Sequence, residues 1–198
     1  DLKEIRDMLS EEVVSYRQKY NIPEDAVIIT FTGRLLKEKG IPSLLNVMEQ
    51  IEKERKDVFL FIAGDGDMEE EIQRRKSRHI IPLGRIDFAH IVALLKETEI
   101  FCLPSFSEGF STSILEAAAC RCYIVTTARG GAKELLINDE YGCVIPNNHE
   151  DILYNALIRA IDNQNMRENG TRLTYARIEQ NFTWDIVAAQ VEKICGEN

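Results

Sequence analysis

Six short runs of apolar residues constrain the fold of this 198-residue chain more than any other feature. Their length and their content of β-branched and aromatic residues are typical of strands buried on both faces of a sheet. Segments with helical spacing follow them, as the crossovers of a parallel sheet require. The strands are predicted at residues 26–32, 58–63, 80–83, 99–103, 123–126 and 142–145. We therefore predict an α/β fold, a three-layer sandwich around a mostly parallel six-stranded sheet.

The segments between the runs set the expected domain organisation. Helices are predicted over residues 1–22, 41–55, 67–77, 87–96, 133–137, 150–162, 166–180 and 183–195, with one more beginning near residue 112. Asp67 and Asp87 are the predicted N-caps of two of them, since a carboxylate accepts from first-turn N–H groups. No repeat or second core is visible. We expect a leading helix or connector over 1–22, one domain over 23–182 and a C-terminal helix over 183–198.

Composition argues against several classes of protein. The chain has 24 Lys and Arg against 33 Asp and Glu, and this net charge of -9 argues against a nucleic-acid groove across the whole domain. No apolar run is long enough to span a membrane, and the charged N-terminus lacks the apolar core of a signal peptide. The five cysteines are scattered and mostly set in apolar runs, which indicates buried thiols in a reducing compartment. We expect a cytoplasmic location.

The loop after the first predicted strand carries two basic residues between two glycines. Arg34 and Lys39 together would neutralise a diphosphate, and Gly33 and Gly40 permit unusual backbone angles or close approach. Two solvated surface charges are the alternative. Because the carboxyl ends of parallel strands meet at one edge, this loop should share a rim with four others. The five loops are residues 33–40, 64–67, 84–87, 104–112 and 128–131.

The loop after the fourth predicted strand runs into a helix whose start suits an anion. Gly109 lets a ligand approach the backbone, and Ser111 or Thr112 is expected to cap the helix. The first N–H groups of such a helix attract negative charge. Two carboxylates flank this site, Glu108 in the loop and Glu116 inside the helix. We expect both to accept hydrogen bonds from hydroxyl groups.

The acidic loop after the second predicted strand admits several interpretations. Gly64 and Gly66 suggest a dinucleotide-binding fingerprint, but Glu69 stands where the third glycine belongs, and the acidic residues would repel a pyrophosphate. Asp65 and Asp67 also have the spacing of a metal-binding pair. A turn with Asp67 as N-cap is the favoured interpretation.

Two further titratable residues have open roles. Glu134 could cap a helix, orient Arg34 or have no role, and His90 is expected to be a surface or hydrogen-bonded histidine. No Ser-His-Asp, Cys-His or metal-ligand constellation can be assembled from the sequence.

Several motifs in order resemble the C-terminal, donor-binding half of retaining glycosyltransferases of the GT-B fold. More narrowly, they resemble glycosyltransferase family four, the "group 1" family. The resemblance covers about residues 20–195 and implies a Rossmann-like domain that forms the C-terminal half of that fold. The motifs are residues 33–34 with 39–40, 63–66, 83–84, 108–110 with 115–117, 130–131 with Glu134, and Gly142.

The resemblance implies roles for particular residues. Arg34 and Lys39 would bind the donor diphosphate and stabilise the leaving nucleotide in place of a metal, so no cofactor is implied. Glu108 would bind the hydroxyls of the transferred sugar and join these two as a catalytic residue, while Glu116 would accept from both ribose hydroxyls. The base would lie against residues 84–86. The implied donor-binding residues are Gly33, Arg34, Lys39, Gly84, Arg85, Ile86, Glu108, Gly109, Phe110, Ser111, Thr112, Leu115 and Glu116.

The implied activity is transfer of a sugar from a nucleoside-diphosphate sugar, with UDP as the expected nucleotide, to a glycan or lipid-linked acceptor. An N-terminal half outside this sequence would bind the acceptor, in a bacterial enzyme of polysaccharide or glycolipid assembly that is compatible with peripheral membrane association. The alternatives are a sugar-nucleotide epimerase half and a non-catalytic nucleotide-sugar-binding module. Three positions depart from the family pattern. Arg121 and Tyr123 stand where a glycine and a proline are common and are expected to alter only a turn, and Ser111 replaces a frequent glycine and is expected to alter the approach of the sugar.

Overall fold

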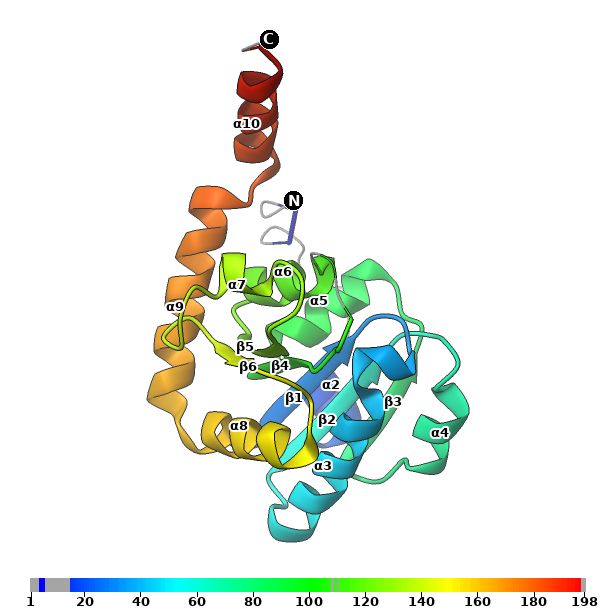
Figure 1. Ribbon diagram of the computed structural model, residues 1–198. Coiled ribbons are helices and arrows are strands. Elements are labelled where there is room, and N and C mark those ends of the chain that lie inside the picture. The colour runs from blue at the N-terminus through cyan, green and yellow to red at the C-terminus, as the bar shows by residue number, and fades with distance from the viewer. Residues whose placement is uncertain (1–3, 6–14, 108, 110, 197–198) are drawn as a thin grey trace.

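The computed structural model describes residues 4–5, 15–107, 109 and 111–196, and it confirms the predicted α/β class. A single six-stranded sheet has the order β3-β2-β1-β4-β5-β6, and every strand pair is parallel (Figure 1). Each strand lies within two residues of a predicted run. The strands are β1 Val27–Thr32, β2 Val58–Ala63, β3 Ile80–Gly84, β4 Ile100–Leu103, β5 Tyr123–Thr127 and β6 Cys143–Ile145.

Helices cover both faces of this sheet because side chains alternate along each strand. In β1, Ile29 and Phe31 belong to the large core that includes α3 and α8, while Ile28 packs in a second core with α2 and α5. The helices are α2 Tyr16–Tyr20, α3 Ile41–Glu54, α4 Glu69–Arg74, α5 Phe88–Lys96, α6 Thr112–Ala119, α7 Ala132–Leu135, α8 Glu150–Asp162, α9 Gln164–Asn181 and α10 Trp184–Gly196, with a short 3-10 helix η2 at Lys37–Lys39.

The strand order places a crevice at the centre of the sheet. The chain builds β1, β2 and β3 toward one side and β4, β5 and β6 toward the other, so the direction reverses between β1 and β4. Loops that leave the carboxyl ends of two such strands diverge to opposite faces of the sheet. The loops after β1 and β4 are therefore the two walls of the crevice.

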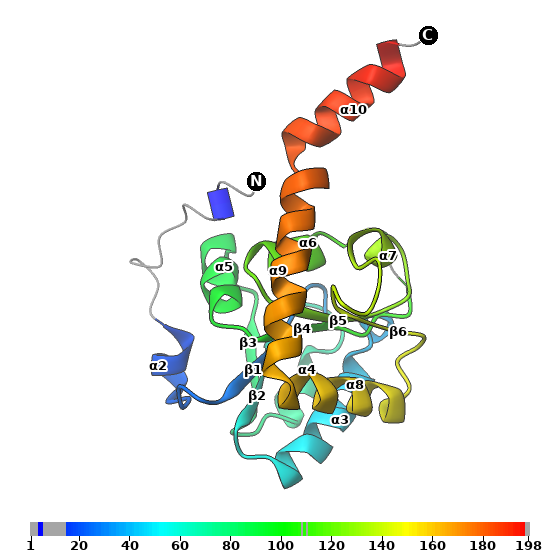
Figure 2. The same cartoon turned by 90° about the vertical axis from the view of Figure 1, so that its left-hand side faces the viewer.

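The two ends of the described chain are anchored differently. Near the N-terminus, Tyr16 is buried against the sheet, and the Arg17 guanidinium donates to the Glu99 carboxylate at 2.6 Å. At the C-terminus α10 projects away from the domain (Figures 1 and 2), and its first residue, Trp184, is 73% exposed. No helix among the described residues is long and apolar enough to cross a bilayer.

The prediction that Asp67, in the acidic loop after β2, caps the next helix is wrong. The helix that follows begins at Glu69 with Met68 at the N-cap position, so Asp67 is not its cap. The Glu69 carboxylate instead accepts from the Gly66 N–H at 2.8 Å, and the Met68 N–H donates to the Leu35 carbonyl at 2.9 Å. These bonds fold the segment into a turn against the loop after β1. The cap at Asp87 is confirmed, because its carboxylate accepts from the His90 N–H at 2.9 Å.

Gly64 and Gly66 allow the loop after β2 to pack closely against the loop after β1. A Cβ on Gly64 would lie 1.9 Å from the Gly33 carbonyl oxygen, and one on Gly66 would lie 2.8 Å from that of Leu35. Both glycines also have φ angles near +145°. Close packing of the two loops therefore accounts for both glycines.

The turn after α6 accounts for one departure from the family pattern. Arg121 has a φ angle of 65°, a left-handed conformation in which glycine is ordinarily favoured. Its guanidinium lies 4.2 Å from the centre of the Tyr175 ring. This cation–π contact stabilises a conformation that costs an arginine about 1–2 kcal/mol.

Candidate functional site

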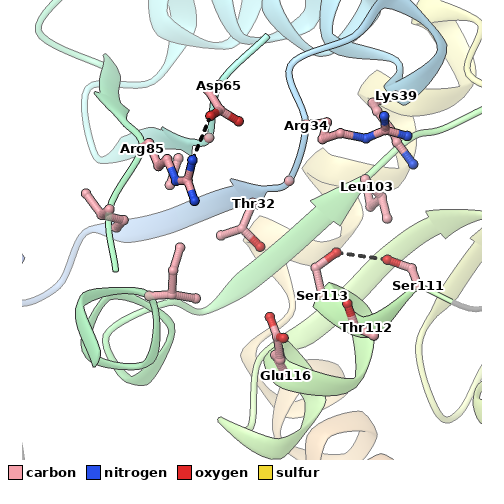
Figure 3. A pocket seen from close by; sticks show the side chains of 15 residues that line it. Thr32, Arg34, Lys39, Asp65, Arg85, Leu103, Ser111, Thr112, Ser113 and Glu116 are labelled. Carbon is pink, nitrogen blue, oxygen red and sulfur yellow. Dashed lines mark hydrogen bonds and ion pairs between the residues drawn. The ribbon is translucent and has the colours of Figure 1, made fainter. Parts of the chain in front are cut away.

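A cavity of about 610 Å³ opens in the crevice at the centre of the sheet (Figure 3). Its walls come from the loops after β1, β2 and β3 and from the start of α6. It is lined by Thr32, Gly33, Arg34, Lys39, Ala63, Gly64, Asp65, Arg85, Ile86, Ile91, Leu103, Ser111, Thr112, Ser113 and Glu116. The cavity joins side chains that are up to 84 positions apart in the sequence.

The basic wall of the cavity comes from the loop after β1. Arg34 is exposed, forms no ion pair with a described residue and lies near Lys39 at one side of the opening (Figure 3). The loop is fixed to the opposite wall, because the Ser105 hydroxyl and the Phe106 N–H both donate to the Glu38 carbonyl at 2.9 Å. The two charges therefore stand on a loop whose position is set by the chain across the crevice.

The helix α6 forms the facing wall. Ser111 occupies its predicted N-cap position, but no first-turn N–H donates to the Ser111 side chain. The Ser111 hydroxyl instead bonds the Ser113 hydroxyl at 2.8 Å. The predicted position of the cap is thus confirmed, but the predicted hydrogen bond from a first-turn N–H to the cap side chain is absent. The start of α6 faces the cavity without a side-chain cap, which leaves its N–H groups available to an anion.

Glu116 lies one turn into the same helix and lines the cavity. Burial raises the pKa of its carboxyl group above the ordinary value. No described residue forms a hydrogen bond or ion pair with this carboxylate. A carboxylate that is desolvated without a protein partner costs the fold free energy, which hydroxyl groups of a ligand would recover.

We expect Glu116→Gln to raise the free energy of unfolding at pH 7 relative to the unaltered chain. The carboxyl has a higher pKa folded than unfolded, so the stability that its protonated form contributes is complete below the unfolded pKa and is lost as the pH rises through the folded pKa. The advantage of the neutral amide should therefore vanish in acid. Urea unfolding at pH 4 and pH 7 measures this, and an equal difference at both pH values would contradict it.

Asp65 and Arg85 form the third side of the cavity. The Arg85 guanidinium lies 3.6 Å from the Asp65 carboxylate, and the Arg85 side chain is 83% exposed. Exposed pairs of this kind contribute about 0–1 kcal/mol, so both side chains can move when a ligand arrives. Asp67 is also exposed, and no group of three or more metal-ligating side chains gathers among the described residues.

The structure brings most of the predicted site residues to one cavity. Gly84 only flanks it, with its carbonyl accepting from the Gly64 N–H at 2.9 Å. Leu115 packs on the large core instead, because one helical residue turns it about 100° from Glu116. Gly109 is not among the lining residues, and Glu108 and Phe110 lie outside the described residues. The predicted residues that line the cavity are Gly33, Arg34, Lys39, Arg85, Ile86, Ser111, Thr112 and Glu116.

Sequence analysis missed other lining residues, of which Thr32, Asp65 and Ser113 are polar. Thr32 could have been noticed as a polar residue at the end of an otherwise apolar strand. The two residues with open roles lie elsewhere. Glu134 is exposed in α7 and its carbonyl accepts from Arg177 at 2.6 Å, while His90 is exposed and its Nδ1 bonds the Asp87 carboxylate at 2.7 Å.

The central crevice of this parallel sheet holds two basic side chains, a helix start without a side-chain cap and a carboxylate with no partner among the described residues. These features define a class of α/β domain whose crevice suits an anionic ligand that carries hydroxyl groups. A comparison with known protein families assigns the chain more narrowly than this structural class does. Residues 14–176 match the model of the family "Glycosyl transferases group 1", and the chain belongs to this family.

Curated relatives are similar over almost the whole chain. An uncharacterized glycosyltransferase of Methanocaldococcus jannaschii is 26% identical over 93% of this chain and 49% of its own length. The GDP-mannose-dependent monoacylated alpha-(1-6)-phosphatidylinositol monomannoside mannosyltransferase of Corynebacterium glutamicum is 26% identical over 98% of this chain and 53% of its own length. The chain therefore spans about half the length of these relatives.

Solved structures show the same fold. HepE of Anabaena, in complex with UDP, has a TM-score of 0.83 and 19% identity, and the match covers 100% of this chain and 56% of HepE. The C-terminal domain of the group 1 glycosyl transferase LpcC of Francisella tularensis has a TM-score of 0.73 and 22% identity, and the match covers 84% of this chain and 91% of that domain. The Rossmann-like fold is thus that of the C-terminal domain of GT-B glycosyltransferases.

Proposed function

We propose that this chain is the donor-binding domain of a retaining glycosyltransferase that takes a nucleoside-diphosphate sugar. One observation carries the proposal: Arg34 and Lys39 face the start of α6 and the half-buried Glu116 across a single cavity. Cationic side chains and helix N–H groups suit a diphosphate, and a carboxylate that no described residue binds suits ribose hydroxyls. A nucleoside diphosphate presents these two chemistries next to each other.

The same groups would assist breakage of the glycosidic bond. Negative charge grows on the nucleoside diphosphate as it leaves the sugar, and groups already aimed at that charge stabilise the transition state. We propose that Arg34, Lys39 and the α6 start fulfil this role without a metal. Glu108, which lies outside the described residues, is proposed from the family resemblance to bind hydroxyls of the transferred sugar and to complete the catalytic set.

Two relatives indicate which class of donor this chain takes. HepE has been solved with UDP-glucose, and the Corynebacterium relative is named as GDP-mannose-dependent, so a nucleoside diphosphate is common to both. We propose UDP for this chain, with a glycan or lipid-linked acceptor held by a second domain in a cytoplasmic enzyme. The phosphatidylinositol N-acetylglucosaminyltransferase subunit of Schizosaccharomyces pombe, 28% identical over 88% of this chain, supports a lipid-linked acceptor.

Calorimetric titration of the chain with UDP, GDP and ADP, with and without EDTA, tests the proposal. At least one nucleotide should bind with an affinity that EDTA leaves unaltered. Glu116→Ala should weaken that binding by about tenfold or more, because hydrogen bonds to a charged group contribute about 1.5–3 kcal/mol. Glu150→Ala, an exposed carboxylate in α8 outside the cavity, is the matched control and should bind as the unaltered chain does. Binding of none of the three nucleotides would refute the proposal.

A further inference from the structure

Thr32 is the last residue of β1 and lies on the floor of the donor cavity. It is 3% exposed, and it stands between the basic loop on one side and Ser113 and Glu116 on the other (Figure 3). Its hydroxyl oxygen is covered and has no hydrogen-bond partner among the described residues. A buried polar group in this state costs the fold free energy and calls for a reason.

Other buried threonines of the chain show that this state is exceptional. The Thr30 hydroxyl, two residues earlier on the same strand, bonds the Thr98 hydroxyl at 2.7 Å. The hydroxyls of Thr126 and Thr174 donate to the carbonyls of Leu103 and Tyr141 at 2.8 Å and 2.6 Å. Valine has nearly the shape of threonine and a high preference for strands, so it would fill the position of Thr32 without an unsatisfied hydroxyl. The hydroxyl is therefore not explained by the fold.

We propose that Thr32 is a further donor-binding residue, whose hydroxyl donates to a phosphate oxygen at the junction of the diphosphate and the ribose. This inference rests on the proposed function. A ligand that reaches from Arg34 and Lys39 to Glu116 must pass over the floor on which Thr32 lies. The oxygen is covered in the absence of ligand, so we expect the side chain to turn about its Cα–Cβ bond into another staggered rotamer as the phosphate enters.

Three variants test the role of the hydroxyl. Thr32→Val removes it and keeps the volume, Thr32→Ser keeps it and removes the methyl group, and Thr30→Val is the matched control with a partnered hydroxyl. Each variant is unfolded thermally without ligand and titrated with UDP, GDP and ADP. Thr126→Val serves as a second control in the event that Thr30→Val does not fold.

The variants should show opposite effects on stability and on binding. Thr32→Val should keep or raise the Tm and weaken nucleotide binding by about tenfold, whereas Thr32→Ser should bind within about threefold of the unaltered chain. Thr30→Val should lower the Tm and leave binding unaltered. Full binding by Thr32→Val, or equal losses in Thr32→Val and Thr32→Ser, would overturn the inference while the proposed function stands. If the unaltered chain binds none of the nucleotides, the proposed function is wrong and this inference with it.

Discussion

Arg34→Ala is expected to weaken the binding of the nucleoside diphosphate by about 30- to 140-fold. A guanidinium–phosphate interaction is charge-assisted and contributes about 2–3 kcal/mol, and each 1.4 kcal/mol is a factor of ten in affinity. The arginine is exposed, lines the cavity and has no ion pair with a described residue, so its loss should not alter the fold. Calorimetric titration at about 0.15 M salt measures the effect, because at this ionic strength long-range attraction between the protein's charges and the nucleotide is largely screened.

Lys37→Ala is the matched control for this experiment. Lys37 lies in η2 of the same loop, is exposed and is not among the residues that line the cavity, so its removal takes away the same charge without the proposed contact. Its affinity should stay within about twofold of the unaltered chain. If both variants lose the same affinity, the loop acts only through its net charge. If Arg34→Ala binds fully, the assignment of Arg34 to the diphosphate is wrong.

The strands could be predicted from sequence because burial on both faces leaves a simple signal. Residues 58–63 are all buried, and a run without polar alternation is what a central parallel strand requires. The site loops followed from the same reasoning, because parallel strands bring their carboxyl ends to one edge. Arg34 and Glu116, 82 positions apart in the sequence, could therefore be expected near each other from the sequence alone.

The remaining features depend on contacts between loops that are distant in the sequence. Asp67 has the right residue type for an N-cap, but the turn formed with Leu35 places Met68 there instead. Thr32 resembles any strand threonine until the structure shows that no described residue forms a hydrogen bond with its hydroxyl. Which of two adjacent helical residues, Leu115 or Glu116, faces the cavity also depends on how α6 packs. The conformational preferences of single residues do not depend on such contacts, so they cannot predict features that tertiary packing determines.

Gly40→Ala is expected to lower the free energy of unfolding by about 2–5 kcal/mol, which is a large fraction of the stability of a domain. Gly40 has a φ angle of 77°, which costs alanine about 1–2 kcal/mol. An added Cβ would also lie 2.0 Å from the Pro104 carbonyl oxygen, so the backbone of the loop after β1 or β4 must move. Overpacking of this kind costs about 1–3 kcal/mol more. Urea unfolding monitored by circular dichroism measures the loss.

Gly109→Ala is the control, since Gly109 lies on the same rim but has open space around its Cα and a φ angle outside the left-handed region. Its stability should stay within about 0.5 kcal/mol of the unaltered chain. Because the contact at Gly40 holds the Arg34 loop against the loop that leads into α6, Gly40→Ala should also weaken nucleotide binding at temperatures where the variant is folded. Unaltered stability in Gly40→Ala would contradict the close approach of the two walls, and full binding by a destabilised variant would show that their spacing does not determine affinity.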